Sequence, residues 1–266
     1  MKIAIIGTGN LGKSIAKGLV SNQDIDTLYL TKRNLKDLKE FEDNKHIVIT
    51  QDNVFAIQQS EIVIVAVQPA QIEQLLIDAK TVLTEKHIII STITGFSIAN
   101  IEDIIGKQQA IIRAMPNTAI AVGKSMTCLC GNAQGEQRIK TAAIIFNELG
   151  HTLQIPESQM QAATVVCASG IAFWMRLIRA TTQAAIQLGF DAKEAQELAM
   201  YTSEGAASLL IQNKQHPEQE IDRVTTPKGC TIEGLNEMEH KGLSSSLIQG
   251  MVASFTKINT IKKEQL

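Results

Sequence analysis

Near its N-terminus the chain reads Lys2-Ile3-Ala4-Ile5-Ile6 and then Gly7-Thr8-Gly9-Asn10-Leu11-Gly12. The apolar run predicts a buried strand, and the glycines fit the pattern G-x-G-x-x-G, which we expect to open a helix over residues 10–20. Gly7 allows a tight turn, Gly9 leaves room for a pyrophosphate, and Gly12 lets helix pack on strand. Amides at the helix N-terminus would face the phosphate charge. We therefore predict a dinucleotide site over all six residues of this loop. The alternative is a turn that binds nothing.

Length and composition indicate an ordinary soluble globular protein. The 266 residues suffice for two modest domains, and 44% of them are hydrophobic and 20% charged. A formal net charge of -2 without a basic stripe makes nucleic acid and membranes unexpected partners. We expect no uninterrupted apolar stretch of membrane-spanning length, and we interpret residues 162–177 as a buried helical segment with a break. The N-terminal apolar run is too short for a signal peptide, so a cytoplasmic location is expected.

The first half of the chain alternates short β-rich runs with helical patterns. Strands are expected at residues 2–6, 27–31, 62–67, 87–91, 110–114 and 152–155. This rhythm predicts an α/β fold of the Rossmann type, with a doubly wound, mostly parallel sheet. Residues 119–130 are expected to form a further strand pair or an irregular hairpin.

From residue 157 onward only helices are expected. They cover residues 157–167, 171–188, 192–212 and 231–241, with a last one from 243 to near the end of the chain. Asp191 follows Gly189 and is a plausible N-cap. We place the boundary near Pro156, with an NAD(P)-binding Rossmann domain over residues 1–156 and an all-α domain over 157–266.

The end of the second expected strand bears on cofactor choice. An NAD site usually has Asp or Glu there, whereas this chain has Thr31, Lys32 and Arg33. A hydroxyl and two cations suit a 2′-phosphate, and the planar guanidinium group of Arg is well shaped to hold it. We therefore expect NADPH to be favoured over NADH. The alternative is that both cations belong to a solvated turn.

The cysteines and histidines indicate no metal site. The four cysteines show neither a disulfide-rich pattern nor zinc spacing, and Cys128 and Cys130 should share one face of a strand. We expect four reduced thiols and no bound metal. The five histidines form no triad with their sequence neighbours and are interpreted as structural or solvated.

Four further segments follow in order along the chain. They read Ala66-Val67-Gln68-Pro69, Ser91-Thr92-Ile93-Thr94-Gly95, Arg113-Ala114-Met115-Pro116-Asn117-Thr118 and Val224-Thr225-Thr226-Pro227-Lys228-Gly229-Cys230-Thr231-Ile232. Together with the glycine loop they resemble the pyrroline-5-carboxylate reductase family over nearly the whole chain. The third segment is similar to the family's Arg-x-Met-Pro-Asn-Thr, and the fourth to its Val-Thr-Ser-Pro-Gly-Gly-Thr-Thr-Ile. These two motifs are the specific ones.

The chain departs from the family around the expected substrate site. Lys228 replaces a glycine and Cys230 a threonine, and Cys167-Ala168-Ser169-Gly170-Ile171-Ala172-Phe173 stands where the family has Ser-Gly-Ser-Gly-Pro-Ala-Tyr. The cofactor segments are less changed. The inference about fold and cofactor is therefore firmer than the inference about substrate.

The resemblance implies NAD(P)H-dependent reduction of a cyclic imine, pyrroline-5-carboxylate, to proline. Nicotinamide supplies the hydride, so the protein mainly has to hold the ring against the nicotinamide. Cofactor contacts are expected from Ala66, Val67, Gln68, Pro69, Pro116 and Asn117. Substrate contacts are expected from Thr226, Lys228, Gly229, Cys230, Thr231, Ser169 and Gly170, with Thr226 and Thr231 as the catalytic hydroxyls.

Several of these residues have simpler interpretations that stay open. Thr231 could be a plain N-cap, Pro116-Asn117 an ordinary turn, Ser169-Gly170 a helix kink and Lys228 a solvated lysine. The resemblance also implies a homodimer through the C-terminal helices, with larger rings as a further expectation. Apolar residues over 162–177 favour such an interface.

Three other functions compete with this interpretation. The layout also resembles two-domain 3-hydroxyacid dehydrogenases, but residues 171–188 contain Arg176 and Arg179 and no lysine to act as their acid–base group. A second alternative is a reductase of the same fold for a different cyclic imine acid. The third is a non-enzymatic NADPH-binding regulator with a degenerate substrate site.

Overall fold

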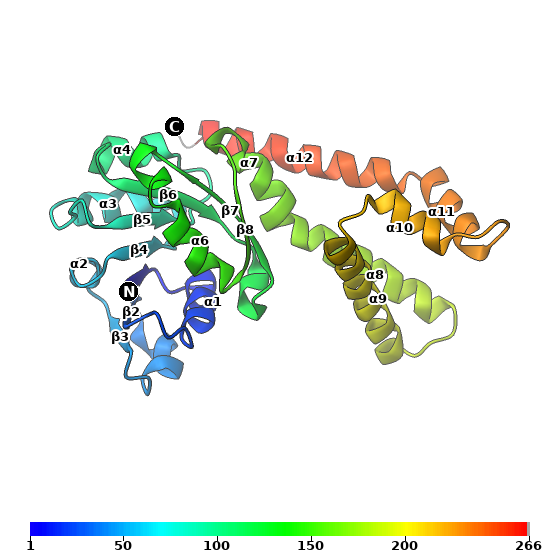
Figure 1. The fold of residues 1–266 in the computed structure, drawn as a ribbon, viewed down its shortest axis with the longest axis horizontal. Helices are drawn as coiled ribbons and strands as arrows, with labels where there is room; N and C mark the ends of the chain where they lie inside the picture. Colours follow the sequence, from blue (N-terminus) through cyan, green and yellow to red (C-terminus); the bar gives the residue numbers. More distant parts are fainter. Residues whose placement is uncertain (265–266) are drawn as a thin grey trace. The chain divides into compact units, whose positions relative to one another are not determined.

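The computed structural model describes residues 1–264 and contains two compact units (Figure 1). The first unit is Met1–Ser169 together with the end of the chain from Lys257, and the second is Gly170–Thr256. The first is an α/β unit and the second is entirely helical. An α/β half followed by an all-α half confirms the fold class expected from the sequence.

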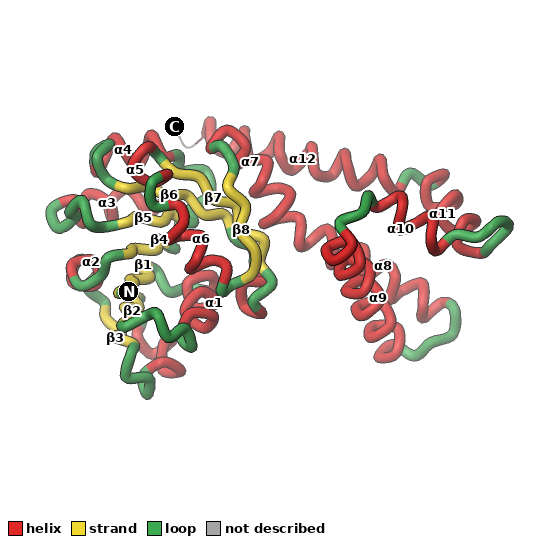
Figure 2. Tube along the Cα trace, viewed as in Figure 1, coloured by secondary structure: helices red, strands yellow, loops and turns green. Residues whose placement is uncertain are grey.

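An eight-stranded sheet forms the centre of the first unit (Figure 2). Its order is β3-β2-β1-β4-β5-β6-β7-β8, and all neighbours pair in parallel except β6 and β7. The strands are β1 (Lys2–Ile6), β2 (Thr27–Thr31), β3 (Ile47–Thr50), β4 (Ile62–Val65), β5 (Ile88–Ser91), β6 (Ala110–Met115), β7 (Ser125–Gly131) and β8 (Gly150–Gln154). The strand order reverses between β1 and β4, and open α/β sheets carry their ligand crevice at such a switch point, outside the carboxyl ends of the strands.

Both faces of the sheet are covered by helices. Ile3 and Ile5 of β1 belong to one buried cluster, while Ala4 and Ile6 belong to the other, because alternate side chains point to opposite faces. The first face is covered by α1 (Asn10–Leu19), η1 (Leu35–Phe41), η3 (Thr118–Val122) and α6 (Ile139–Asn147). The second is covered by α2 (Asn53–Gln58), α3 (Ile72–Lys80), α4 (Ile98–Ile105) and α7 (Met160–Ala163). Burial on both sides explains why the parallel strands are apolar without alternation.

Short helices complete the first unit. They are η2 (Pro69–Gln71), α5 (Ala133–Glu136), η4 (Glu157–Gln159) and the π-helical turn η5 (Thr164–Ser169). Every strand expected from the sequence is present, with small differences at the ends. The sequence did not reveal β3, a short edge strand whose residues are only partly buried.

The expected strand pair over residues 119–130 is wrong in its first half. Asn117 accepts a hydrogen bond from the Ala119 amide and caps the 3-10 helix η3, which ends at Gly123 in a left-handed conformation. The second half is the single strand β7, which pairs antiparallel with β6. Polar capping therefore overrides the strand preference of this apolar segment.

The second unit is formed by long helices. They are α8 (Gly170–Gln187), α9 (Ala192–Asn213), α10 (Pro217–Val224), α11 (Cys230–His240) and α12 (Leu243–Glu264), the last of which continues into the first unit. Asp191 caps α9 as expected, and Glu194 completes a capping box. The sequence analysis missed α10, although Pro217 in its first turn is a typical start signal.

One helical stretch, Glu157–Gln187, is long and apolar enough by length and composition to cross a membrane. The most apolar part of this stretch has a mean hydropathy of 1.4. This corrects the expectation that no such stretch exists, because α7, η5 and α8 join without the expected break. A single helix of this kind is weak evidence for a span, since core helices of soluble proteins share its composition. The expectation of burial is also wrong for the chain alone, because Val166, Trp174 and Met175 are exposed.

Candidate active site

The glycine loop joins β1 to α1 at the crevice between β1 and β4. Gly7 has a φ of 89°, and a Cβ there would lie 2.6 Å from Val67 Cγ1. A Cβ at Gly12 would lie 2.8 Å from the Gly7 carbonyl oxygen. No other heavy atom of the described residues lies within 4 Å of the Cβ position at Gly9. The first and third glycines thus have the expected packing roles, and the space above the second is open for a ligand.

Two threonines hold this loop in place. The Thr8 amide donates to the Thr31 carbonyl oxygen at 2.8 Å, and the Gly7 amide donates to Thr31 Oγ1 at 3.2 Å. Both threonines are fully buried or nearly so. The structure therefore gives Thr31 a role in supporting the loop from β2. Its direct contact with a cofactor stays a prediction.

The two cations after β2 differ in their surroundings. Lys32 Nζ lies 2.9 Å from Asp37 Oδ2, and this hydrogen bond lowers the pKa of the Asp37 carboxyl. Arg33 is exposed, and its carbonyl oxygen accepts a hydrogen bond from Gln51 Nε2. Asp37 is not among the residues predicted from the sequence, because it lies beyond the end of β2, inside η1. Lys32 is therefore already paired in part, whereas the Arg33 guanidinium remains exposed for an anion.

The segment after β4 lies beside the glycine loop, as expected. The Ala66 amide donates to the Ile6 carbonyl oxygen at 2.8 Å, and Val67 occupies the space that a side chain at Gly7 would need. Gln68 then caps η2, in which Pro69 is the first residue. These four residues, predicted as cofactor contacts, therefore follow the strand on one side of the crevice.

The end of β6 is bonded to the π-helical turn. Asn117 Nδ2 donates to the Cys167 carbonyl oxygen at 3.1 Å, and the Asn117 amide donates to Ser125 Oγ at 3.1 Å. Pro116 is buried. A π-turn disturbs the regular carbonyl bonding of a helix and is frequent at functional sites. The helix is thus continuous at Ser169 but irregular in its bonding, and Asn117 takes up one of its carbonyl groups.

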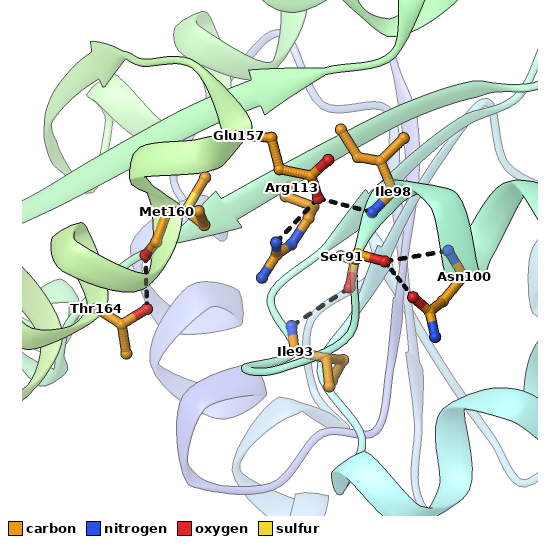
Figure 3. Close-up of polar contacts among 9 residues, drawn as sticks. Ser91, Ile93, Ile98, Asn100, Arg113, Glu157, Met160 and Thr164 are labelled. Atoms are coloured by element: carbon orange, nitrogen blue, oxygen red, sulfur yellow. Dashed lines mark hydrogen bonds and ion pairs between the residues drawn. The ribbon is translucent and has the colours of Figure 1, made fainter. Parts of the chain in front are cut away.

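A buried arginine fixes the start of the same helical stretch (Figure 3). Arg113 Nη1 lies 3.0 Å from Glu157 Oε1, and the Ile98 amide donates to that oxygen at 2.7 Å. Arg113 is 5% exposed, and its Nε has no hydrogen-bond partner among the described residues. Glu157 therefore neutralises a buried charge and joins the ends of β6 and α4 to the first helical turn after β8. Sequence reasoning had not singled out this glutamate.

In the second unit, the loop between α10 and α11 brings the predicted substrate residues together. The Gly229 amide donates to the Thr226 carbonyl oxygen at 2.9 Å, and a Cβ at Gly229 would lie 2.4 Å from Thr226 Oγ1. Helix α11 begins at Cys230 with Gly229 as N-cap. No side chain among residues 1–264 caps this helix, so Thr231 is an ordinary helical residue and not the N-cap. The Thr226 hydroxyl thus lies next to the uncapped start of α11.

Lys228 has a φ of 60° in this loop. A left-handed conformation costs a residue with a Cβ about 1 kcal/mol, whereas glycine adopts it freely. The lysine that stands in place of the family's glycine is therefore strained in this loop. Outside the loop, Lys214 after α9 has a similar φ of 52°.

The predicted site residues fall into both units. The cofactor residues and Ser169 belong to the first unit, while Gly170 and the loop from Thr226 to Thr231 belong to the second. Within residues 1–264, no group of three or more His, Cys, Asp or Glu side chains is arranged to hold a metal ion. The arrangement in the first unit can hold a dinucleotide, and the loop in the second offers amides and hydroxyls to an anion.

Two family models match the chain. Residues 2–95 match a model described as NADP oxidoreductase coenzyme F420-dependent, and residues 157–261 match pyrroline-5-carboxylate reductase dimerisation. Pyrroline-5-carboxylate reductase 1 of Dictyostelium discoideum is 45% identical, over 96% of this chain and 49% of that protein. Pyrroline-5-carboxylate reductase 2 of the same organism is 42% identical, over 96% of this chain and 91% of that protein.

A solved structure is similar along its whole length. The pyrroline-5-carboxylate reductase of Coxiella burnetii superposes with a TM-score of 0.91 at 29% identity, over 97% of each chain. Its similarity covers both the α/β unit and the helical unit. The present chain spans about half the length of the first Dictyostelium relative, but nearly all of the second and of the Coxiella protein.

We predict that Glu157→Ala destabilises the protein by about 3 kcal/mol, because it leaves the Arg113 charge buried without its partner. Glu157→Gln keeps an acceptor oxygen and should cost less. Urea unfolding of the three proteins measures the difference. The exposed Glu85 makes a matched control, since Glu85→Ala should change stability by no more than about 0.5 kcal/mol. Equal losses of unfolding free energy in Glu157→Ala and Glu85→Ala would show that the ion pair between Arg113 and Glu157 does not stabilise the protein.

Proposed function

The chain belongs to the pyrroline-5-carboxylate reductase family, and we propose that it reduces pyrroline-5-carboxylate to proline with NAD(P)H. The observation that carries this proposal is 42% identity to a named reductase over 91% of that protein's length. The open space above Gly9 and the loop from Thr226 to Thr231 supply what the two ligands require.

The residues of the first unit fit a dinucleotide. The turn at Gly7 and the close packing at Gly12 bring the amide end of α1 to the crevice, where it faces negative charge. Val67 and Gln68 border the other side of the same crevice. When bound, the cofactor supplies the hydride. The role of this unit is then to hold the cofactor so that one nicotinamide face is open to the imine.

The residues of the second unit fit a small carboxylate. Helix α11 starts without a side-chain cap, so its first amides are free to donate to an anion. The Thr226 hydroxyl lies next to Gly229 at that start, and the Thr231 hydroxyl belongs to the first turn. We propose that the amides and Thr226 orient the carboxylate, while Thr231 contacts the ring nitrogen. A protonated imine needs little further acid catalysis, so holding the ring is the main task.

The test is a spectrophotometric assay with pyrroline-5-carboxylate and NADPH, with proline measured as the product. We expect steady NADPH oxidation with one proline formed per NADPH consumed. A six-membered imine acid as the better substrate would favour the alternative reductase. Cofactor binding without turnover on any cyclic imine acid would favour the regulator. Thr231→Val keeps the size of the side chain and should lower kcat while leaving the dissociation constant of NADPH unchanged.

We also propose a preference for NADPH through Lys32 and Arg33. Replacing both by Ala should raise the KM for NADPH about tenfold or more and change that for NADH little, because a charge-assisted contact to phosphate is worth about 1.5–3 kcal/mol. Arg33→Ala should account for most of the effect, since Lys32 already pairs with Asp37. Lys36→Ala is the matched control on the same exposed segment. Equal effects on both cofactors would contradict the proposal.

Lys228 allows the strain and the charge to be measured separately. Lys228→Gly should stabilise the protein by about 1 kcal/mol by relieving the left-handed strain, and Lys214→Gly should do the same. Lys228→Met keeps the strain and removes the charge. If the ammonium contacts the substrate carboxylate, Lys228→Met raises the KM for the imine about tenfold, and Cys230→Thr recovers part of the loss. An unchanged KM would make Lys228 a solvated lysine.

We propose a homodimer through the helices of the second unit. The match of residues 157–261 to a dimerisation model supports it, as do the apolar side chains left exposed by this chain alone. These side chains include Trp174, Met175, Tyr201, Ile248 and Val252. Assembly of dimers into larger rings, a domain boundary near Pro156 and a cytoplasmic location stay predictions.

Light scattering at micromolar concentration should therefore give the mass of a dimer. Val252→Glu, which places a charge on the exposed apolar face of α12, should shift the mass toward that of a monomer. The matched control is Ile77→Glu, an equally exposed apolar residue of α3 in the first unit, which should remain dimeric. A monomeric wild-type protein would refute the proposal.

A further inference from the structure

Two cysteines from distant parts of the chain meet inside the first unit. Cys128 Sγ of β7 and Cys167 Sγ of the π-helical turn lie 3.9 Å apart, although the two residues are separated by 39 positions in the sequence. Cys128 is 2% exposed, whereas Cys167 is only partly buried. Cys167 is thus the less buried residue of the pair, and Cys128 is closed off from solvent.

The hydrogen bond between the two thiols makes them chemically unequal. The contact between the two sulfurs lowers the pKa of the Cys167 thiol to about 7 and raises that of Cys128. The thiolate is the form that reacts with oxidants, so Cys167 is the more reactive sulfur at neutral pH. Cys130, two positions along the same strand face, is a useful contrast, because burial raises the pKa of its thiol to about 11.

We propose that Cys128 and Cys167 form a peroxide-responsive modification site whose oxidation to a disulfide inhibits the enzyme. The Cys167 thiolate attacks one oxygen of hydrogen peroxide, the O–O bond breaks, and the hydroxide released takes up a proton to become water. The resulting sulfenic acid is attacked by the Cys128 sulfur, which gives up its proton as the S–S bond forms and a second water leaves. Two thiols lose two electrons, and one peroxide is reduced to two waters.

Closing the bond requires the helical turn to move. A disulfide needs about 2.05 Å between the sulfurs, so the present separation has to shrink by roughly 1.9 Å. Cys128 is held by strand pairing on both sides, opposite Met115 of β6 and Leu153 of β8. Cys167 belongs to a π-turn, in which the helical bonding is already irregular. The shift therefore falls mainly on Cys167.

That movement reaches the proposed site through the backbone of Cys167. Its carbonyl oxygen accepts the hydrogen bond from Asn117 Nδ2, and Ser169 follows two residues later. Both residues are proposed ligand contacts, so this part of the inference rests on the proposed function. A displacement of about 1 Å in positioning groups can lower activity by up to a hundredfold. Oxidation should thus lower kcat/KM by about tenfold or more.

The chemical half of the test is independent of activity. The full-length protein is treated with hydrogen peroxide, the remaining thiols are blocked, and the digest is analysed by mass spectrometry. We expect a cross-link between Cys128 and Cys167, lost in Cys167→Ser and in Cys128→Ser and reversed by dithiothreitol. Cys130→Ser, the matched control, should retain it. Circular dichroism tests whether each variant is folded. If the buried substitution Cys128→Ser prevents folding, Cys167→Ala replaces it in the comparison. Absence of the cross-link, or a cross-link between other cysteines, overturns the proposal.

The functional half compares oxidised and reduced protein. Wild type and Cys130→Ser should lose activity with peroxide and regain it with dithiothreitol, while Cys167→Ser should be unaffected. Inactivation of Cys167→Ser to the same extent, for example through the exposed Cys230, would overturn the inhibition. Full activity of the cross-linked protein would also overturn the proposed inhibition. If no cyclic imine acid is reduced even by the untreated enzyme, the proposed function fails. NADPH affinity, measured by fluorescence, then provides the readout, and equal affinity in both redox states overturns the inference.

Discussion

The close approach of three backbone segments at the crevice between β1 and β4 constrains the whole first unit. The loop after β1, the start of α1 and the residue after β4 lie so near one another that side chains fit at neither Gly7 nor Gly12. Two consequences follow from this packing. The amide end of α1 is brought to the edge of the sheet, and the position of Gly9 is left open. Threonine hydroxyl and amide bonds from β2 then keep the loop in this shape even without a ligand.

A second set of contacts attaches the start of the long helical stretch to the sheet. Glu157 neutralises the buried Arg113 charge and accepts from the first amide of α4, while Asn117 holds a carbonyl of the π-turn. Both contacts use residues of the Arg-x-Met-Pro-Asn motif, so a single strand end fixes the helix at two points. The cysteine pair joins β7 to the same π-turn, so the proposed oxidation would act on the element that Asn117 holds.

The helical unit has a different physical basis. Buried side chains are few in its helices, with Ala195 and Ala199 of α9 and Thr182 of α8 among them, and several large apolar side chains face outward. A chain with so small a core of its own gains stability by covering those faces with a second copy. The family model for dimerisation covers this part of the chain. The loop before α11, which carries proposed substrate residues, belongs to this same helical unit.

Local pattern determined what the sequence could reveal. Apolar strands, the glycine loop, the Asp191 cap and the family motifs predicted the doubly wound sheet and the helical half, because each depends on neighbours along the chain. The same motifs supplied the candidate site residues, whose ligand contacts stay predictions. Local pattern could not reveal β3, because pairing at the edge of the sheet decides its place. Nor could it reveal η3, where a polar cap overrides the strand preference of the segment. Long-range contacts were equally hidden: Glu157 beside Arg113, and Cys128 beside Cys167. Only the tertiary fold brings such pairs together, because their distance in space is independent of their separation in sequence.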